Sequence, residues 1–146
     1  MRRFAVAILL PVLVIVALAG LRPVPRQAPD ALRATVTVTV LFQCAGTRSV
    51  TPWVTRVKHG DDIDWALDPA SDVSEIDIVP KRGGPLYRWP WTGGNMRGNR
   101  ERPAQARGMR PNARGEHRYN IYAMCPGPGG SQRREVIDPD IIIDLD

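Results

Sequence analysis

The chain has 146 residues, with 20 lysines and arginines against 15 aspartates and glutamates, a formal net charge of +5 and two cysteines. This length provides one hydrophobic core and excludes two comfortable domains. The charge is unevenly divided, because residues 30–80 are mainly acidic and residues 81–118 are mainly basic.

The N-terminus has the pattern of a secretory signal peptide. Met1-Arg2-Arg3 is positively charged, the run from Phe4 to Leu18 is apolar, and Ala17-Leu18-Ala19 has the small-x-small form that signal peptidase cleaves. We therefore predict a signal peptide at residues 1–19 and a periplasmic or secreted protein. The alternative is an uncleaved anchor at residues 4–21, and only then do we expect attachment to the membrane. Residues 20–33 contain three prolines and no apolar period, which predicts an extended linker.

The domain is predicted to begin at residue 34 and to be built from strands. Residues 34–42 alternate small or polar residues with β-branched apolar ones, the pattern of a half-buried strand. Residues 53–58 and 62–67 predict two more strands, which we expect to form a hairpin around the turn His59-Gly60-Asp61. Residues 75–79 predict a further strand, with Ile76 and Ile78 pointing inward.

The C-terminal part completes the set with strands at residues 118–124 and 133–145. Pro139 lacks an N–H group, so we expect it at a sheet edge or a bulge. Sustained helical periodicity is absent after the leader, and the short strands are separated by Gly, Pro and Asp turns. The sequence therefore predicts an all-β sandwich over residues 34–146, interrupted by a long basic loop rich in Gly, Pro and Arg at residues 81–115.

Two segments resemble the cupredoxin family. The segment from Val57 to Trp65 resembles the hairpin "V-K-x-G-D-x-V-x-W" of cupredoxins, and residues 116–130 with the final strand are similar to their closing hairpin. The resemblance implies a Greek-key β-sandwich. In the family, copper is held by a histidine in the loop after the Trp-bearing strand, and by a cysteine, a second histidine and a methionine around the last loop.

Those copper ligands are missing from this chain. Residues 68–74 contain no histidine, and neither histidine nor methionine follows Cys125. A type 1 copper site needs two imidazoles and a thiolate with a weak axial ligand, so we expect no copper and no other cofactor. The two histidines, His59 and His117, lie where the family's ligands do not.

Cys44 and Cys125 are predicted to form a disulfide, because two cysteines in a small exported domain usually pair. If consecutive strands are antiparallel, Cys44, residues 68–74 and Cys125 all lie at the same end of the sandwich. A redox-active pair and a soft-metal site are the alternatives.

The basic segment is the main candidate for a binding surface, since aromatic rings and guanidinium groups alternate in it. The predicted contact residues are Tyr87, Arg88, Trp89 and Trp91 for the aromatic part and Arg97, Arg100 and Arg102 for the charges. Two other interpretations stay open. The segment could be a solvated loop, or it could fold onto its own domain, with the arginines covering an acidic face (Asp62, Asp64, Glu75 and Asp77) and Trp89-Pro90-Trp91 closing the sheet.

The sequence contains two weaker patterns. Asp61, Asp62 and Asp64 suggest calcium but need help from another loop to converge. His117 beside Glu116 has the chemistry of a general base, but no nucleophile motif accompanies it.

We therefore predict a non-catalytic binding or structural module of the cell envelope. Its expected partner is an anionic envelope component or an acidic protein, and no regulated nucleic-acid binding is expected in that compartment. The alternative is a periplasmic metal-binding or redox protein that uses Cys125, His117 and Met124.

Overall fold

The computed structural model describes residues 33–81 and 88–144. The predicted signal peptide, almost all of the predicted linker, and Tyr87 lie outside the described residues. Within them the chain is all-β, with one short 3₁₀ turn, η1 (Pro128–Gly130). No helix in these two ranges is long and apolar enough to span a membrane. The strands are β1 (Thr35–Phe42), β2 (Arg48–Thr51), β3 (Val54–Lys58), β4 (Asp62–Leu67), β5 (Glu75–Pro80), β6 (Trp91–Gly93), β7 (Arg97–Asn99), β8 (Ala104–Met109), β9 (Gly115–Pro126), β10 (Gln132–Ile137) and β11 (Asp140–Asp144).

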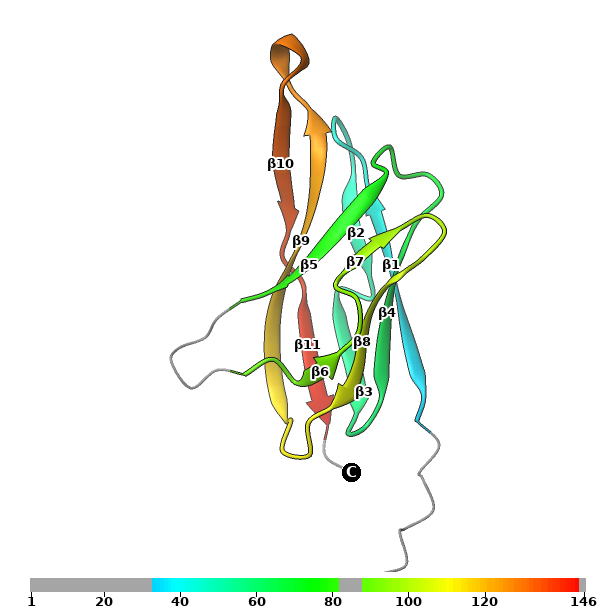
Figure 1. Ribbon diagram of the computed structural model, residues 1–146, viewed down its shortest axis with the longest axis vertical. Coiled ribbons are helices and arrows are strands. Elements are labelled where there is room, and N and C mark those ends of the chain that lie inside the picture. The colour runs from blue at the N-terminus through cyan, green and yellow to red at the C-terminus, as the bar shows by residue number, and fades with distance from the viewer. Residues whose placement is uncertain (1–32, 82–87, 145–146) are drawn as a thin grey trace, which may run out of the picture. The chain divides into compact units, whose positions relative to one another are not determined.

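The strands form two sheets (Figure 1). The first sheet has the order β2-β1-β4-β8-β6, and the second has the order β3-β11-β9-β5-β7, with β10 also paired to β9. Each sheet contains one parallel pair, β1 with β4 and β3 with β11. The prediction of an all-β domain built from two sheets is confirmed.

The predicted hairpin around Gly60 is wrong, although both of its strands exist. The turn is present, with Gly60 at a φ of 99° and the Asp61 N–H bonded to the Lys58 carbonyl at 3.1 Å. However, β3 pairs with β11, whereas β4 lies between β1 and β8, so the turn connects the two sheets. Both strands bury alternate residues, and this pattern is the same whether two strands pair edge to edge or face each other across a core.

The segment 81–115 is not simply a loop, because it contains β6, β7 and β8. Two of the glycines that suggested a loop are required by close packing. A Cβ atom on Gly98 would lie 2.3 Å from the Ala104 nitrogen, and one on Gly94 would lie 2.1 Å from the Gln105 carbonyl oxygen. A glycine in a strand region can mark a close backbone approach rather than a loop.

The predicted C-terminal strand is divided into β10 and β11. Both pair with β9 in one continuous register, since Ile137 faces Ile121 and Asp140 faces Arg118. Pro139 lies in the break between them, which agrees with its inability to donate a hydrogen bond to the ladder.

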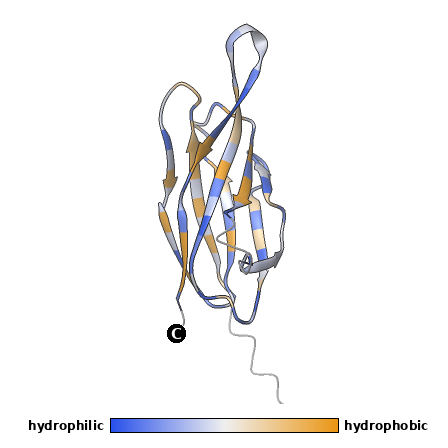
Figure 2. Cartoon of the chain, turned by 90° about the vertical axis from the view of Figure 1, so that its left-hand side faces the viewer, coloured by the Kyte–Doolittle hydropathy of each residue, from blue (hydrophilic) through white to orange (hydrophobic). Residues whose placement is uncertain are grey.

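The core lies between the two sheets and follows the alternation of the strands. Figure 2 shows hydrophobic residues alternating with polar ones along the strands. The largest fully buried side chains include Trp65, Phe42, Ile63, Ile76 and Tyr119. The Trp65 indole N–H donates to the Tyr119 hydroxyl at 3.0 Å, which satisfies the one polar atom of this large ring inside the core.

Candidate functional site

The disulfide end of the sandwich brings three separate segments together. Cys44, in the loop after β1, is bonded to Cys125 at the end of β9, with an S–S distance of 2.00 Å and a Cα–Cα distance of 5.5 Å. The Cys44 N–H donates to both carboxylate oxygens of Asp72, at 2.9 and 3.0 Å, so residues 68–74 join the same end. The predicted pairing of the cysteines and the predicted gathering of these loops are therefore confirmed.

The loop before β5 is held firmly beside the disulfide. Its Ser71 hydroxyl accepts a hydrogen bond from the Phe42 N–H at 3.0 Å and donates to the Val40 carbonyl at 3.3 Å. Ser71 is 3% exposed, so these bonds are shielded from water. The Ser71 carbonyl also accepts a hydrogen bond from the Arg100 guanidinium, which connects this loop to the turn between β7 and β8.

An open pocket with a volume of about 450 Å³ lies between these two segments. One wall comes from the loop before β5 and the other from the turn between β7 and β8; its lining residues are Asp72, Val73, Ser74, Asn99, Arg100 and Glu101. The Asn99 side-chain oxygen accepts the N–H groups of Glu101 at 2.9 Å and Arg102 at 2.8 Å, and this shapes the turn. The pocket thus has a defined wall that carries the predicted contact residue Arg100.

The three predicted contact arginines after the tryptophans have different surroundings. Arg97 contacts Asp77 at 2.8 Å and Glu75 at 3.3 Å within its own sheet. The hydrogen bond with Asp77, and then the charges of Asp77 and Glu75, raise the pKa of Arg97. The Arg102 side chain is exposed and makes no hydrogen bond or ion pair with the other described residues. Arg100 and Arg102 therefore share the turn at the pocket, whereas Arg97 is already neutralised.

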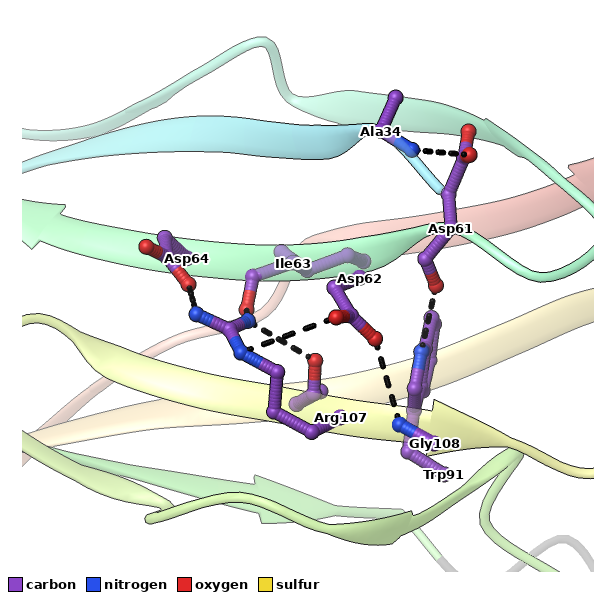
Figure 3. Close-up of polar contacts among 9 residues, drawn as sticks. Ala34, Asp61, Asp62, Ile63, Asp64, Trp91, Arg107 and Gly108 are labelled. Carbon is purple, nitrogen blue, oxygen red and sulfur yellow. Dashed lines mark hydrogen bonds and ion pairs between the residues drawn. The ribbon is translucent and has the colours of Figure 1, made fainter. Parts of the chain in front are cut away.

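The aromatic half of the predicted contact surface belongs largely to the core. Trp91 is 2% exposed, and its indole N–H donates to the Asp61 carbonyl at 2.9 Å (Figure 3). The partly buried Trp89 packs on it with a ring-centroid distance of 5.2 Å, and Pro90 between them is fully buried. This is a correction for Trp91, which cannot meet a partner from inside the core. The interpretation of Trp89-Pro90-Trp91 as a segment that closes the sheet describes them correctly. Arg88 is exposed.

The acidic faces are covered by arginines of the basic segment, as one of the open interpretations expected. Arg107 forms ion pairs with Asp64 and, at 3.8 Å, with Asp62, and it donates to the Ile63 carbonyl at 3.0 Å (Figure 3). On the second sheet, Arg97 covers Glu75 and Asp77 in the same way. Arg107 was not among the predicted contact residues. Its positive charge, in a basic segment of a chain with an acidic strand face, could have predicted these ion pairs.

The three carboxylates considered for calcium point to different partners. Asp61 accepts the N–H groups of Ala34 at 3.1 Å and Lys58 at 3.0 Å, and Asp62 accepts the N–H of Gly108 at 3.2 Å. Asp64 faces Arg107 (Figure 3). The structure does not bring these side chains together around one point.

The alternative redox or metal set is also separated by the fold. Cys125 is in the disulfide, and His117 lies near the opposite end of β9. Met124 is 49% exposed while its neighbour Cys125 is 1% exposed, because successive residues of a strand point to opposite faces. His117 is buried, its Nε2 atom lies 3.1 Å from the Arg114 carbonyl, and burial lowers its pKa. These three side chains do not form a common site.

Comparison of the chain with models of known protein families, with curated proteins and with solved structures finds no match. What the site can do is therefore inferred from its own geometry.

Proposed function

We propose that this protein is an exported, non-catalytic binding module of the cell envelope that recognises an anionic group through the turn carrying Arg100 and Arg102. The observation that carries the proposal is the open pocket of about 450 Å³ at the disulfide end, with Arg100 in its wall and the exposed Arg102 beside it. A guanidinium group presents several donors in one plane, which suits a carboxylate or phosphate of a surface component.

The disulfide supports the export part of this proposal. Cys125 is buried and bonded to Cys44, and such pairs persist in oxidising compartments. The leader pattern at residues 1–19 is consistent with the same route. We infer a periplasmic or secreted location from these two features together.

We also propose that the domain is a cupredoxin-like Greek-key sandwich without copper. The mixed order of both sheets supports this, since the first strand β1 lies between β2 and β4 and the last strand β11 lies between β3 and β9. Residues 68–74 and the end of β9, to which the resemblance assigns the family's copper ligands, meet at the disulfide. In this proposal a covalent cross-link stabilises the end that the family uses for its metal.

The proposal is tested by the binding of purified protein to isolated envelope fractions at low salt. Arg102→Gln, alone and combined with Arg100→Gln, should reduce the bound fraction severalfold, and the binding of the unaltered protein should fall as salt is added, because exposed charges are screened. Arg97→Gln is the matched control, since Arg97 is paired with Asp77 and should leave binding unchanged.

Two results would contradict the proposal. One is equal binding by the unaltered protein and the double variant at low salt. The other is binding that does not respond to salt. The single Arg102→Gln variant separates binding from stability, because the Arg102 side chain makes no hydrogen bond or ion pair with other described residues, whereas the Arg100 guanidinium donates a hydrogen bond to the Ser71 carbonyl.

A further inference from the structure

The end of the sandwich opposite the disulfide carries a group of exposed arginines. The start of β1, the turn between β3 and β4 and the turn between β8 and β9 lie together at this end, whereas the ends of β1 and β9 next to the disulfide lie at the other (Figure 1). Four arginines, from the start of β1, the segment before β6 and the turn between β8 and β9, are exposed and form no ion pair with other described residues. They are Arg33, Arg88, Arg110 and Arg114, and we refer to them as the basic surface.

Hydrogen bonds join the start of the described chain to the neighbouring turns. The Ala34 N–H donates to the Asp61 carboxylate at 3.1 Å, which places Arg33 beside the turn between β3 and β4. In the same turn, the His59 Nε2 atom lies 3.2 Å from the Arg110 carbonyl oxygen. The turn between β3 and β4 therefore connects two members of the basic surface.

The other two members are connected through the turn between β8 and β9. The Ala113 N–H donates to the Arg110 carbonyl at 3.0 Å, so Arg110 and Arg114 stand at the two sides of one short turn. The Arg110 Nε atom donates to the Trp89 carbonyl at 3.1 Å, and Arg88 directly precedes Trp89. The basic surface is thus one connected region built from three segments of the chain.

The acidic side chains around the basic surface already have partners. Asp61 is 8% exposed and accepts the N–H groups of Ala34 and Lys58, so its carboxylate faces backbone groups rather than solvent. Three more acidic residues form ion pairs with arginines outside the basic surface, namely Asp62 with Arg107 at 3.8 Å, Glu116 with Arg118 at 3.0 Å and Asp144 with Arg56 at 3.4 Å. The positive charge of the basic surface is therefore balanced from outside the described domain.

We propose that the basic surface docks on a membrane that contains anionic phospholipid. A guanidinium group binds phosphate oxygens through several N–H donors, and arginines near an anionic lipid surface are attracted to it. The four arginines are spread over one end of the domain and line neither of the two pockets, of about 450 and about 210 Å³. Charge that is spread in this way suits the many headgroups of a lipid surface, whereas a single small anion is bound in a concave site.

The path of the chain favours a lipid surface over an acidic protein. Arg33, where the described domain begins, belongs to the basic surface, and the apolar run from Phe4 to Leu18 precedes it in the sequence. While the predicted leader is held in the membrane during export, this end of the domain is the one joined to it. The segments that carry the basic surface contain none of the large exposed hydrophobic residues of the described chain, so we expect a reversible contact made by charge.

The inference goes beyond the proposed function, because Arg100 and Arg102 lie at the disulfide end. The two sites use different arginines at opposite ends of the sandwich, so each can be removed without altering the other. A domain that rests on lipid through the basic surface holds the pocket with Arg100 away from the membrane, where another envelope component can reach it.

The test is cosedimentation of the soluble exported protein with lipid vesicles at low salt. We expect binding to vesicles of phosphatidylglycerol and phosphatidylcholine, and little binding to vesicles of phosphatidylcholine alone. Binding to the anionic vesicles should fall as salt is added, because exposed charges are screened. The side chains of Arg88 and Arg114 make no hydrogen bond or ion pair with other described residues. Arg88→Gln and Arg114→Gln should each lower the vesicle partition coefficient about fivefold.

The matched control is the double variant Arg100→Gln with Arg102→Gln. It removes the same charge from the opposite end as Arg88→Gln with Arg114→Gln removes from the basic surface. The control should keep vesicle binding and lose envelope binding, so a failure of one proposal is distinguished from a failure of the other. Thermal unfolding checks that both double variants keep the fold.

Three results would overturn the proposal. One is equal binding to the anionic and the zwitterionic vesicles, including no binding to either. Another is an equal loss of vesicle binding in the two double variants, because the protein would then respond only to its net charge. The third is envelope binding that needs Arg88 and Arg114 in a protein that does not bind pure lipid vesicles, which would assign the basic surface to an acidic macromolecule.

Discussion

The two ends of the sandwich use neighbouring parts of one basic segment for opposite purposes. At one end, Trp89, Pro90 and Trp91 close the core against the turn that contains Asp61. At the other end, Arg100 and Arg102 stand on a turn beside an open pocket and the disulfide. These residues are close in sequence and chemically suited to one binding surface, but the tryptophans pack in the core and the two arginines are exposed. We refer to these as the aromatic end and the disulfide end.

The difference teaches that a mixed aromatic and basic segment is not a site by composition alone. A tryptophan stabilises the fold most when its ring is buried away from water. An arginine instead forms an ion pair with an acidic side chain or keeps its guanidinium group in water. In this chain, Arg97 and Arg107 find acids on their own sheets, and Arg102 stays solvated. Arg100 and Arg102 at the disulfide end are exposed, and no acidic side chain of the described residues forms an ion pair with them.

The largest effect is expected at the aromatic end. Trp91→Ala removes a ring that is 2% exposed together with its hydrogen bond to the Asp61 carbonyl, so the free energy of unfolding should fall by about 3–5 kcal/mol. Urea denaturation followed by circular dichroism measures this change. If Trp91→Ala instead kept its stability and lost envelope binding, the aromatic residues would be part of the contact surface. The two ends would then not differ in the way described above.

The disulfide end should show the next largest effect. Replacing both Cys44 and Cys125 by alanine removes a cross-link with a sequence separation of 81 and should lower the free energy of unfolding by roughly 2–5 kcal/mol. The same urea experiment, with and without reductant on the unaltered protein, provides the comparison. Equal midpoints under all conditions would show that Asp72 and Ser71 hold this end without the disulfide.

The smallest effect concerns His117, which lies towards the aromatic end of β9. Burial lowers the pKa of His117 below its ordinary value of 6.5, so the unfolded chain binds a proton that the folded chain resists. The stability contributed by neutral His117 should therefore be lost progressively as the pH falls through about 6.5, and no change from this group is expected above that range. Urea midpoints at about pH 7.5 and about pH 5.5 measure the loss. His117→Gln should show a smaller loss than the unaltered protein, and an equal loss would assign the effect to other groups.

Several features could be predicted from local pattern. The alternation in residues 34–42 and at Ile76 and Ile78 predicts strands with the correct buried faces, because side-chain direction in a strand depends only on its period of two. The pairing of Cys44 with Cys125 was predictable because the chain offers no other cysteine. The match between acidic strand faces and arginines was predictable as one of three interpretations of the basic segment, since opposite charges on facing positions attract.

Other features depended on which strands become neighbours. The sequence by itself determined an all-β domain, a disulfide and a set of strand faces, because these follow from residue periodicity and residue chemistry. The tertiary structure decided that β3 and β4 belong to different sheets, that Gly94 and Gly98 serve close packing, and that Trp91 is buried while Arg102 is not. It also placed Tyr122 beside Val136, from strands that the sequence did not order. The physical reason is that strand pairing and loop packing depend on residues that are distant in sequence. The same local pattern of buried and exposed residues is compatible with more than one strand order.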